Sequence, residues 1–435
     1  MIHRSTLRRA PPVLVAATAV ASLLRPGPPP AATAPALERA ETAFAEGRLE
    51  EAAAGYAAAL AERPGDPRAL LQGGRLALWR HRLAEAGPRL ARAHQSSPGE
   101  ETLDLLLTLA YRRGDFAAAA DRARELGREA RAAQLDHLSP LPPYRVRGDV
   151  AETILPFVRT DPLPLVELSV NGSEPALFLI DTGGGELILD PGFAESVGAG
   201  RFGSRTGTFA GDQRAEVELG AVEGVGLGEL LVENVPVRLL STARFAPVAG
   251  GRTVHGILGT TLLSRFVFTL DYPAGRLVLR RPDAAAPAVR PGSATVPVWL
   301  AGDHLILAEG RIGGARPGLM LIDTGLAGGG FAASDSTLAE AGIGGAGGEI
   351  EGEGGGGRVR ATPVVAPEIA LGPVVRRDVP GFAGVFPASL EHRLGCRIAG
   401  LLSHGFLRGH AVTFDLARSE MTLAPPGDPA EPGSR

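Results

Sequence analysis

Residues 177–183 read Leu-Phe-Leu-Ile-Asp-Thr-Gly, and residues 319–325 read Leu-Met-Leu-Ile-Asp-Thr-Gly. In both stretches four apolar residues lead directly into an aspartate, which is Asp181 in the first and Asp323 in the second, 142 positions later. A short apolar run of this kind predicts a buried β-strand. The Asn-Gly pair upstream of the first run and the Gly-Gly pair upstream of the second predict hairpin turns. The repetition therefore predicts two related β lobes in tandem.

A second pair of motifs follows at an offset of 144 positions, where Ile257-Leu258-Gly259 corresponds to Leu401-Leu402-Ser403. The same offset relates residues 268–271 to residues 412–415. In the first half, Asp190 followed by Pro191 predicts the capped start of a short helix. We expect the first lobe over residues 150–286 and the second over 287–425, followed by a disordered tail over 426–435.

The order of these motifs resembles that of the retropepsin-like aspartic proteases, which have an apolar strand ending in Asp-Thr-Gly, then a flap, then Ile-Leu-Gly and a helix. Both lobes carry the pattern, so the chain is similar in bilobal plan to pepsin. The resemblance covers about 275 of the 435 residues. It implies an all-β protease domain, an endopeptidase activity on peptide or protein substrates, and a catalytic pair made of Asp181 and Asp323.

The chemistry gives a reason for two carboxylates. Hydrolysis without a metal or a nucleophilic side chain requires a group that activates water and a group that protonates the departing amine. Two carboxyl groups held about 3 Å apart share one proton, because only one of them ionises easily. The charged one takes a proton from water, and the protonated one donates a hydrogen bond to the substrate carbonyl. We assign these roles to Asp181 and Asp323, whose titrations are then coupled.

The resemblance also implies supporting roles for neighbouring residues. Thr182 and Thr324 would each bond to the backbone of the opposite lobe, and Gly183 and Gly325 would let the backbone turn tightly beside the carboxylates. The motif expected to pack beneath the active loops consists of Ile257, Leu258, Gly259, Leu401, Leu402 and Ser403.

The flaps are expected in the glycine-containing hairpins about 30 residues after each aspartate, with Phe209 and Gly211 in the first and Gly355 in the second. Glycine at a flap tip lets the backbone close over a substrate. Three positions depart from the family pattern: Gly184 and Leu326 stand where a small Ala, Ser or Thr is usual, and Ser403 stands where glycine is usual.

Composition excludes several other chemistries. All 44 basic residues are arginine, which rules out the lysine of a phosphate-binding loop, a Schiff base or a Ser–Lys dyad. The formal charge of −4 argues against a nucleic-acid groove. The single cysteine, Cys396, cannot form an internal disulfide.

The remaining titratable residues suggest structural roles. His255, His392, His404 and His410 lack metal-ligand spacing, so we predict neither a metal site nor a cofactor. Asp271 and Asp415 each open a terminal hairpin, where turn formation is the expected role.

The first third of the chain has a different character. Residues 1–36 read as an export signal, with basic residues before an apolar run of twelve, and predict a periplasmic or extracellular protein without a stable membrane span. The alternatives are an uncleaved N-terminal anchor and a disordered Ala/Pro-rich tail. Residues 138–149, rich in proline, are expected to be a linker.

Residues 37–137 show internal repetition and resemble tetratricopeptide repeats, which would offer a docking surface for a protein partner. Residues that recur 34 positions apart are Ala52 with Ala86, Tyr56 with Leu90, Ala59 with Ala93 and Pro64 with Pro98. Gly47 and Gly114 stand where turns between helices are expected. The alternative is an Ala-rich bundle without repeat geometry.

The sequence leaves two functions open. The first is an aspartic endopeptidase with a helical docking region. The second is a non-catalytic scaffold that binds peptides with a degenerate protease fold.

Overall fold

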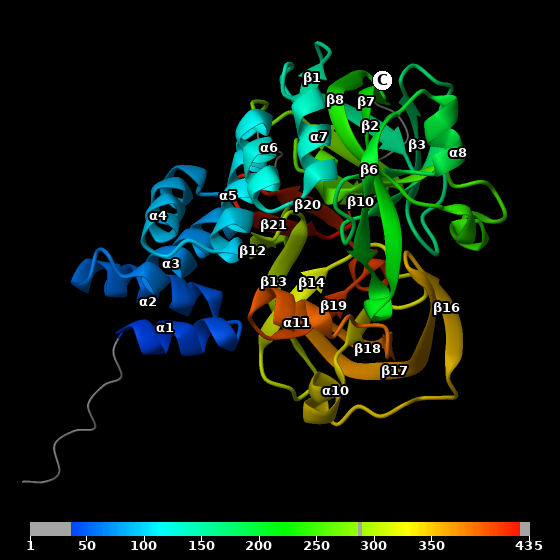
Figure 1. Ribbon diagram of the computed structural model, residues 1–435. Coiled ribbons are helices and arrows are strands. Elements are labelled where there is room, and N and C mark those ends of the chain that lie inside the picture. Colours follow the sequence, from blue (N-terminus) through cyan, green and yellow to red (C-terminus); the bar gives the residue numbers. More distant parts are fainter. Residues whose placement is uncertain (1–35, 286–288, 427–435) are drawn as a thin grey trace, which may run out of the picture. The chain divides into compact units, whose positions relative to one another are not determined.

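A computed structural model describes residues 36–285 and 289–426 (Figure 1). The predicted export signal lies outside these residues, except for Ala36, and so does the predicted tail beyond residue 426. Helices fill the start of the described chain and strands fill the rest. The predicted fold class, an all-helical region followed by a β-rich aspartic protease-type domain, is confirmed.

The helical region comprises residues 36–138. Its helices are α1 (Ala36–Ala45), α2 (Leu49–Glu62), α3 (Pro67–Trp79), α4 (Leu83–Ser96), α5 (Glu100–Arg113), α6 (Phe116–Glu125) and α7 (Glu129–Leu138). Asp66 caps α3 by accepting backbone N–H bonds, and Pro67 takes the first helical position, where a missing N–H costs nothing. Gly47 and Gly114 adopt positive φ between α1 and α2 and between α5 and α6, as a turn requires. None of the described helices is long and apolar enough to cross a membrane.

The first lobe contains an eight-stranded sheet in the order β1-β8-β5-β9-β4-β3-β7-β6. Its strands are β1 (Arg145–Arg147), β3 (Leu165–Val170), β4 (Ala176–Asp181), β5 (Leu187–Leu189), β6 (Gly200–Thr208), β7 (Arg214–Leu227), β8 (Leu230–Leu239) and β9 (Gly256–Gly259). The short helices are α8 (Pro191–Ser196) and α9 (Thr260–Leu263), with 3₁₀ turns at Ala210–Asp212, Ala243–Phe245 and Pro247–Ala249. Because β7 pairs with both β3 and β8, the strands form a closed ring of pairings.

The second lobe repeats this order as β18-β15-β19-β14-β13-β17-β16. Its strand β17 corresponds to β7 and pairs with both β13 and β18, so the ring of pairings is closed here too. Its strands are β13 (Leu305–Ile312), β14 (Gly318–Ile322), β15 (Phe331–Ala333), β16 (Ile350–Gly354), β17 (Gly357–Leu371), β18 (Val374–Ala383) and β19 (Ile398–Leu402). Its helices are α10 (Asp335–Ala341), α11 (Ser389–Leu394) and α12 (His404–Leu407). The duplication seen in the sequence is therefore a duplication of topology.

The two lobes share a third set of strands, in the order β12-β21-β20-β10-β11-β2. These are β2 (Glu152–Pro156), β10 (Val267–Asp271), β11 (Arg276–Arg280), β12 (Ala294–Ala301), β20 (Ala411–Asp415) and β21 (Glu420–Ala424). At the centre Thr269 of β10 lies opposite Thr413 of β20, and their hydroxyls are 2.8 Å apart. These two residues are equivalent in the repeat, separated by 144 positions, so the local two-fold axis passes between them.

The structure differs from the predicted organisation at the linker. Residues 145–147, inside the expected linker, form β1 and pair with β8 of the first lobe. Arg145 and Arg147 are exposed on either side of Val146, so the segment reads as polar although it occupies a sheet edge, where charged side chains are tolerated.

Part of the hydrophobic core of the helical region is shared with the β lobes. Phe44 and Tyr56 belong to the same buried cluster as Trp299 and Leu321 of the second lobe. Tyr111 and other helical residues belong to a cluster that continues through both lobes. Buried polar groups reinforce this contact. They include the Gln134 amide, which donates to two carbonyls of β7 and β8, and the Arg112 guanidinium, which donates to Leu300 and Gly302. The helices are thus an integral part of the folded unit.

The stacked pair Phe268 and Phe414 tests the importance of the shared sheet, because their rings lie 4.6 Å apart at 12° and both are fully buried. Phe414→Ala should lower the free energy of unfolding by about 3–5 kcal/mol, measured by chemical denaturation. Phe414→Leu, which refills part of the volume, should lose clearly less. A loss below about 1 kcal/mol in the alanine variant would show that the sheet does not join the lobes energetically.

Candidate active site

Each aspartate of the two Asp-Thr-Gly motifs stands at the carboxyl end of a buried strand. Asp181 ends β4 and lies opposite Gly259 of the parallel strand β9. Asp323 follows β14, and its N–H donates to the carbonyl of Leu402 in the parallel strand β19 at 2.9 Å. The strand cores are almost wholly buried, so the backbone that carries each carboxyl group is fixed by packing.

The threonines of the motifs join the two lobes by four hydrogen bonds. The N–H of Thr182 donates to the Thr324 hydroxyl at 3.0 Å, and the N–H of Thr324 donates to the Thr182 hydroxyl at 3.1 Å. The Thr182 hydroxyl donates to Ile322 O at 2.9 Å, and the Thr324 hydroxyl donates to Ile180 O at 3.0 Å. Both side chains are fully buried. This reciprocal arrangement is the one that the resemblance implied.

The glycines of the motifs lie against the opposite carboxyl group. A Cβ placed on Gly183 would be 2.4 Å from Cγ of Asp323, and one placed on Gly325 would be 2.6 Å from Cγ of Asp181. Any side chain at either position would therefore overlap the carboxyl group of the other lobe. The absence of a Cβ is what allows the two aspartates to approach each other.

The two carboxylates accept different sets of backbone N–H bonds. Asp181 Oδ1 accepts the N–H of Gly183 at 2.8 Å and the N–H of Gly184 at 3.1 Å. Asp323 Oδ1 accepts the N–H of Gly325 at 2.8 Å. Asp181 Oδ1 thus accepts one more of these backbone N–H bonds than Asp323 Oδ1 does, and such bonds stabilise the negative charge of a carboxylate.

Burial and the negative charge of Asp181 raise the pKa of Asp323 well above its usual range, and a hydrogen bond with the Asp181 carboxylate acts in the same direction. The amides of Gly325 and Gly183 oppose the shift without cancelling it. Asp323 therefore keeps its proton to a higher pH than an ordinary aspartate does.

The six residues of the predicted supporting motif lie beside these loops. Ile257, Leu258 and Gly259 form β9, Leu401 and Leu402 end β19, and Ser403 follows directly. All six are buried. A Cβ on Gly259 would be 2.2 Å from Gly185 O, which explains the glycine in the first lobe.

In the second lobe a serine is tolerated because the loop after Asp-Thr-Gly follows a different path. The Ser403 hydroxyl donates to Leu326 O at 2.8 Å, and its N–H donates to Gly330 O at 2.9 Å. In the second lobe the closest contact between the two loops lies two residues later, at Gly405, where a Cβ would be 2.5 Å from Gly329 O. Ser403 thus holds its loop by a side-chain bond, and in the first lobe Thr260 does so, since its hydroxyl donates to Thr182 O at 2.8 Å and its N–H donates to Gly184 O at 2.9 Å.

The predicted flap tips lie at the ends of two hairpins, β6–β7 and β16–β17, and they meet each other. The Phe209 ring lies against Gly355, where a Cβ would be 2.4 Å from Cδ1 of the ring. The N–H of Gly211 donates to Val385 O of the second lobe at 3.1 Å, and the Asp212 carboxylate accepts from the Ser389 hydroxyl and N–H. The β6–β7 hairpin thus extends from the first lobe to the second (Figure 1).

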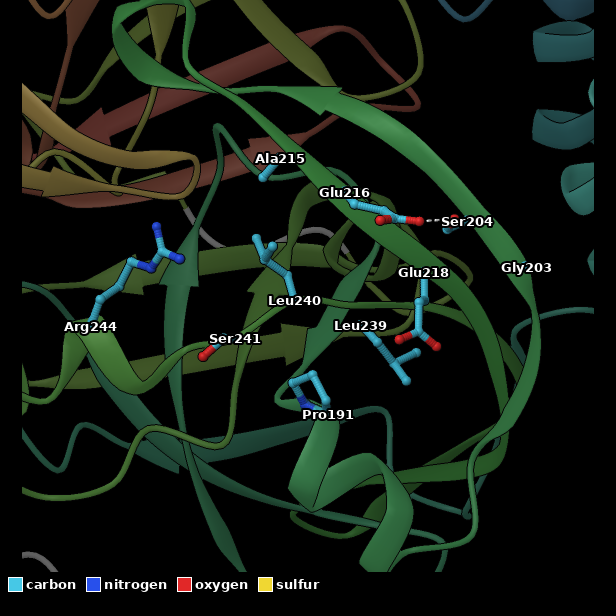
Figure 2. Close-up of a pocket in the computed structure, with 10 residues that line it drawn as sticks. All are labelled: Pro191, Gly203, Ser204, Ala215, Glu216, Glu218, Leu239, Leu240, Ser241 and Arg244. Carbon is cyan, nitrogen blue, oxygen red and sulfur yellow. Dashed lines mark hydrogen bonds between the residues drawn. The ribbon is translucent and has the colours of Figure 1, made fainter.

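A cavity of about 550 Å³ lies beside the stem of the first hairpin. Figure 2 shows it between β6, β7 and the segment that follows β8, with Arg244 at one side. Neither aspartate lines it. Its lining residues are Pro191, Gly203, Ser204, Ala215, Glu216, Glu218, Leu239, Leu240, Ser241 and Arg244.

Four other titratable residues singled out in the sequence have hydrogen-bond partners other than the two aspartates. His255 Nδ1 accepts the N–H of Leu177, and His404 Nε2 bonds to Asp161 at 2.8 Å. Asp271 and Asp415 accept backbone N–H bonds within their hairpin turns, as predicted. In residues 36–285 and 289–426 no three His, Cys, Asp or Glu side chains are grouped so that they could hold a metal ion.

Sequence reasoning missed Glu186, which follows the glycines after Asp181. Its carboxylate is buried and bonds to Tyr111 and Arg131 of the helical region. The only signal in the sequence is a charged residue placed directly before the apolar run Leu187-Ile188-Leu189.

With this geometry established, comparison with known families is informative. The aspartyl protease family model matches residues 166–262 and again residues 308–406. Each lobe is similar to that family. Each matched segment contains one Asp-Thr-Gly motif and its supporting strand. A search of curated proteins finds no match.

The threonine hydrogen bonds can be tested by their contribution to stability. Thr182→Val keeps the shape but leaves the N–H of Thr324 and the carbonyl of Ile322 unpaired in a buried site, at a cost of about 1–3 kcal/mol for each group. Thr182→Ser keeps the hydroxyl and should remain close to wild type. Chemical denaturation measures both variants, and equal stability of the valine and serine variants would contradict the account.

The raised pKa of Asp323 predicts a pH dependence of stability. The native state keeps a proton that the unfolded chain releases above about pH 4, so this contribution is complete below that pH and is lost as pH rises through the raised pKa. The Asp323→Asn side chain does not titrate. The free energy of unfolding of this variant should therefore fall less than that of wild type between pH 4 and neutrality. The exposed Asp283→Asn variant is the control. The same decline in all three proteins would contradict a raised pKa.

Proposed function

We propose that the protein is an aspartic endopeptidase that cleaves peptide bonds with a water molecule activated between Asp181 and Asp323. The observation that carries this proposal is the paired, unequal carboxyl groups at the junction of the two lobes. The twofold match to the aspartyl protease family supports it.

The first step is attack by water on the scissile carbonyl. The Asp181 carboxylate removes a proton from the water molecule. The water oxygen forms a bond to the carbonyl carbon at the same time. The protonated Asp323 donates its proton to the carbonyl oxygen, and a neutral tetrahedral gem-diol results. Asp181 is then protonated and Asp323 is ionised, so the pair still carries one proton.

The second step reverses these roles. Asp323 takes a proton from one hydroxyl of the gem-diol as the carbonyl re-forms, and Asp181 gives its proton to the departing nitrogen as the C–N bond breaks. The products are a carboxylic acid and an amine, and the pair returns to its starting state. One site thus serves as base and acid in turn.

The flaps would control entry to this site. In the structure the tips contact each other and the second lobe through Phe209, Gly211 and Asp212. A peptide must displace these contacts to reach the aspartates, and the hairpins can then close over it and exclude water.

Two further assignments are proposals drawn from the sequence. Residues 1–36 would direct export to the periplasm or outside the cell. The three successive helix pairs α1–α2, α3–α4 and α5–α6 support a tetratricopeptide-type arrangement, which would present its outer surface to a protein partner.

The test is hydrolysis of an unfolded protein by the full-length chain across pH, with and without a statine-type inhibitor. Asp181→Asn and Asp323→Asn should each lower turnover by about 10²- to 10⁴-fold or more while remaining folded. The exposed Asp283→Asn variant should behave as wild type. Wild-type turnover in either active-site variant would exclude the paired mechanism. A wild-type protein that binds the inhibitor and hydrolyses nothing would favour the scaffold alternative.

A further inference from the structure

Glu186 joins the active-site loop of the first lobe to the helical region. It lies five residues after Asp181 and is 2% exposed. Its Oε1 accepts the Tyr111 hydroxyl at 2.7 Å and pairs with the Arg131 guanidinium at 2.7 Å. Its Oε2 accepts Nε of Arg238, a β8 residue, at 3.2 Å. Two of its three partners therefore come from the helices α5 and α7.

The charges around Glu186 alternate in sign, with Arg131 and Arg238 beside Glu186 and with Asp303 beside Arg238. Burial alone would disfavour the charge of Glu186, but Arg131 and Arg238 outweigh that effect and hold its pKa at about 2. Arg131 also lies over the Tyr111 ring at 4.8 Å, and the Tyr111 hydroxyl is 2.7 Å from that of Tyr144. Arg238 reaches Asp303 of the second lobe at 3.2 Å. A buried carboxylate with this many charged partners is held in one position, because leaving any of the groups unpaired is costly.

The loop that ends at Glu186 supplies the amides that hold Asp181. Gly183 and Gly184 donate their N–H groups to Asp181 Oδ1. Neither these residues nor Gly185 has a side chain that could anchor the loop. The carbonyl groups of this loop are bonded within the first lobe: the N–H groups of Thr260 and Thr261 donate to Gly184 O at 2.9 Å and Gly185 O at 3.0 Å, and the Thr260 hydroxyl donates to Thr182 O at 2.8 Å. Glu186 is the first residue after Asp-Thr-Gly with a side chain, and its buried bonds fix the far end of the same loop.

The second lobe solves the same problem internally. Its loop is fixed by Ser403, which bonds to Leu326 O and Gly330 O. The N–H of Gly325 donates to Asp323 Oδ1 at 2.8 Å. In the first lobe the loop after the motif is bonded both within the lobe, through Thr260, and to the helical region, through Glu186.

We infer that Tyr111 and Arg131 are positioning residues for catalysis, which act through Glu186 to hold the Gly183 and Gly184 amides on Asp181. The helical region would then help to position the catalytic carboxylate, in addition to offering a docking surface. The kinetic consequences of this inference rest on the proposed function. The contact of Glu186 with Tyr111 and Arg131 can be tested without measuring activity.

The experiment compares full-length wild type with Glu186→Gln and Tyr111→Phe. Glu129→Gln, an exposed residue on the same helix as Arg131, is the matched control. Glu186→Gln should lower kcat about tenfold and Tyr111→Phe by a smaller factor, because each weakens hydrogen bonds to a buried charge. KM should stay within about twofold, since neither residue is placed in contact with substrate, and the acid limb of the activity profile should move to higher pH.

Hydrogen exchange of the segment 176–190 gives a readout that does not need turnover. Exchange there should be faster in both variants than in wild type and unchanged in Glu129→Gln. If Glu186→Gln does not fold, Tyr111→Phe carries the test. Unchanged exchange and kcat, or a change in KM alone, would overturn the inference. If wild type hydrolyses nothing, the proposed function fails, and the exchange result still decides whether the helices hold the loop.

Discussion

The reciprocal bonding of Thr182 and Thr324 is the constraint on which the rest of the site depends. Each threonine uses its hydroxyl and its N–H to satisfy groups of the opposite lobe, so the two active loops can only be placed together. That placement brings each carboxyl group against the opposite glycine. Burial of Asp323 at this junction raises its pKa, and the negative charge of the neighbouring Asp181 raises it further.

The duplicated lobes are alike in topology and unequal in detail. Asp181 has two amide donors, and its loop is tied through Glu186 to the helical region, whereas the loop after Asp323 is closed by Ser403. Inequality is useful in a pair that must hold one charge and one proton, because it gives each carboxyl group a defined starting state. The shared hydrophobic cores explain how helices distant in sequence can influence that state.

Local patterns predicted much of the site. The apolar runs ending in Asp-Thr-Gly identified the strands and both aspartates, and Asp190 with Pro191 identified the start of α8. Other features depend on partners far along the chain. The pairing of β10 with β20, the strand at Arg145–Arg147 and the burial of Glu186 against Tyr111 each require a contact that no local pattern encodes. Internal repeats predict a separate helical domain, whereas part of the hydrophobic core of these helices is shared with the lobes.

The central claim is that one proton is shared between Asp181 and Asp323. Carbon-13 NMR titration of aspartate carboxyl groups in selectively labelled protein measures this directly, with the two asparagine variants used to assign the signals. The account predicts two coupled titrations, with one displaced well above the usual aspartate range in wild type and returned toward that range when the partner becomes asparagine. Two independent titrations near pH 4, unaffected by the partner, would contradict it.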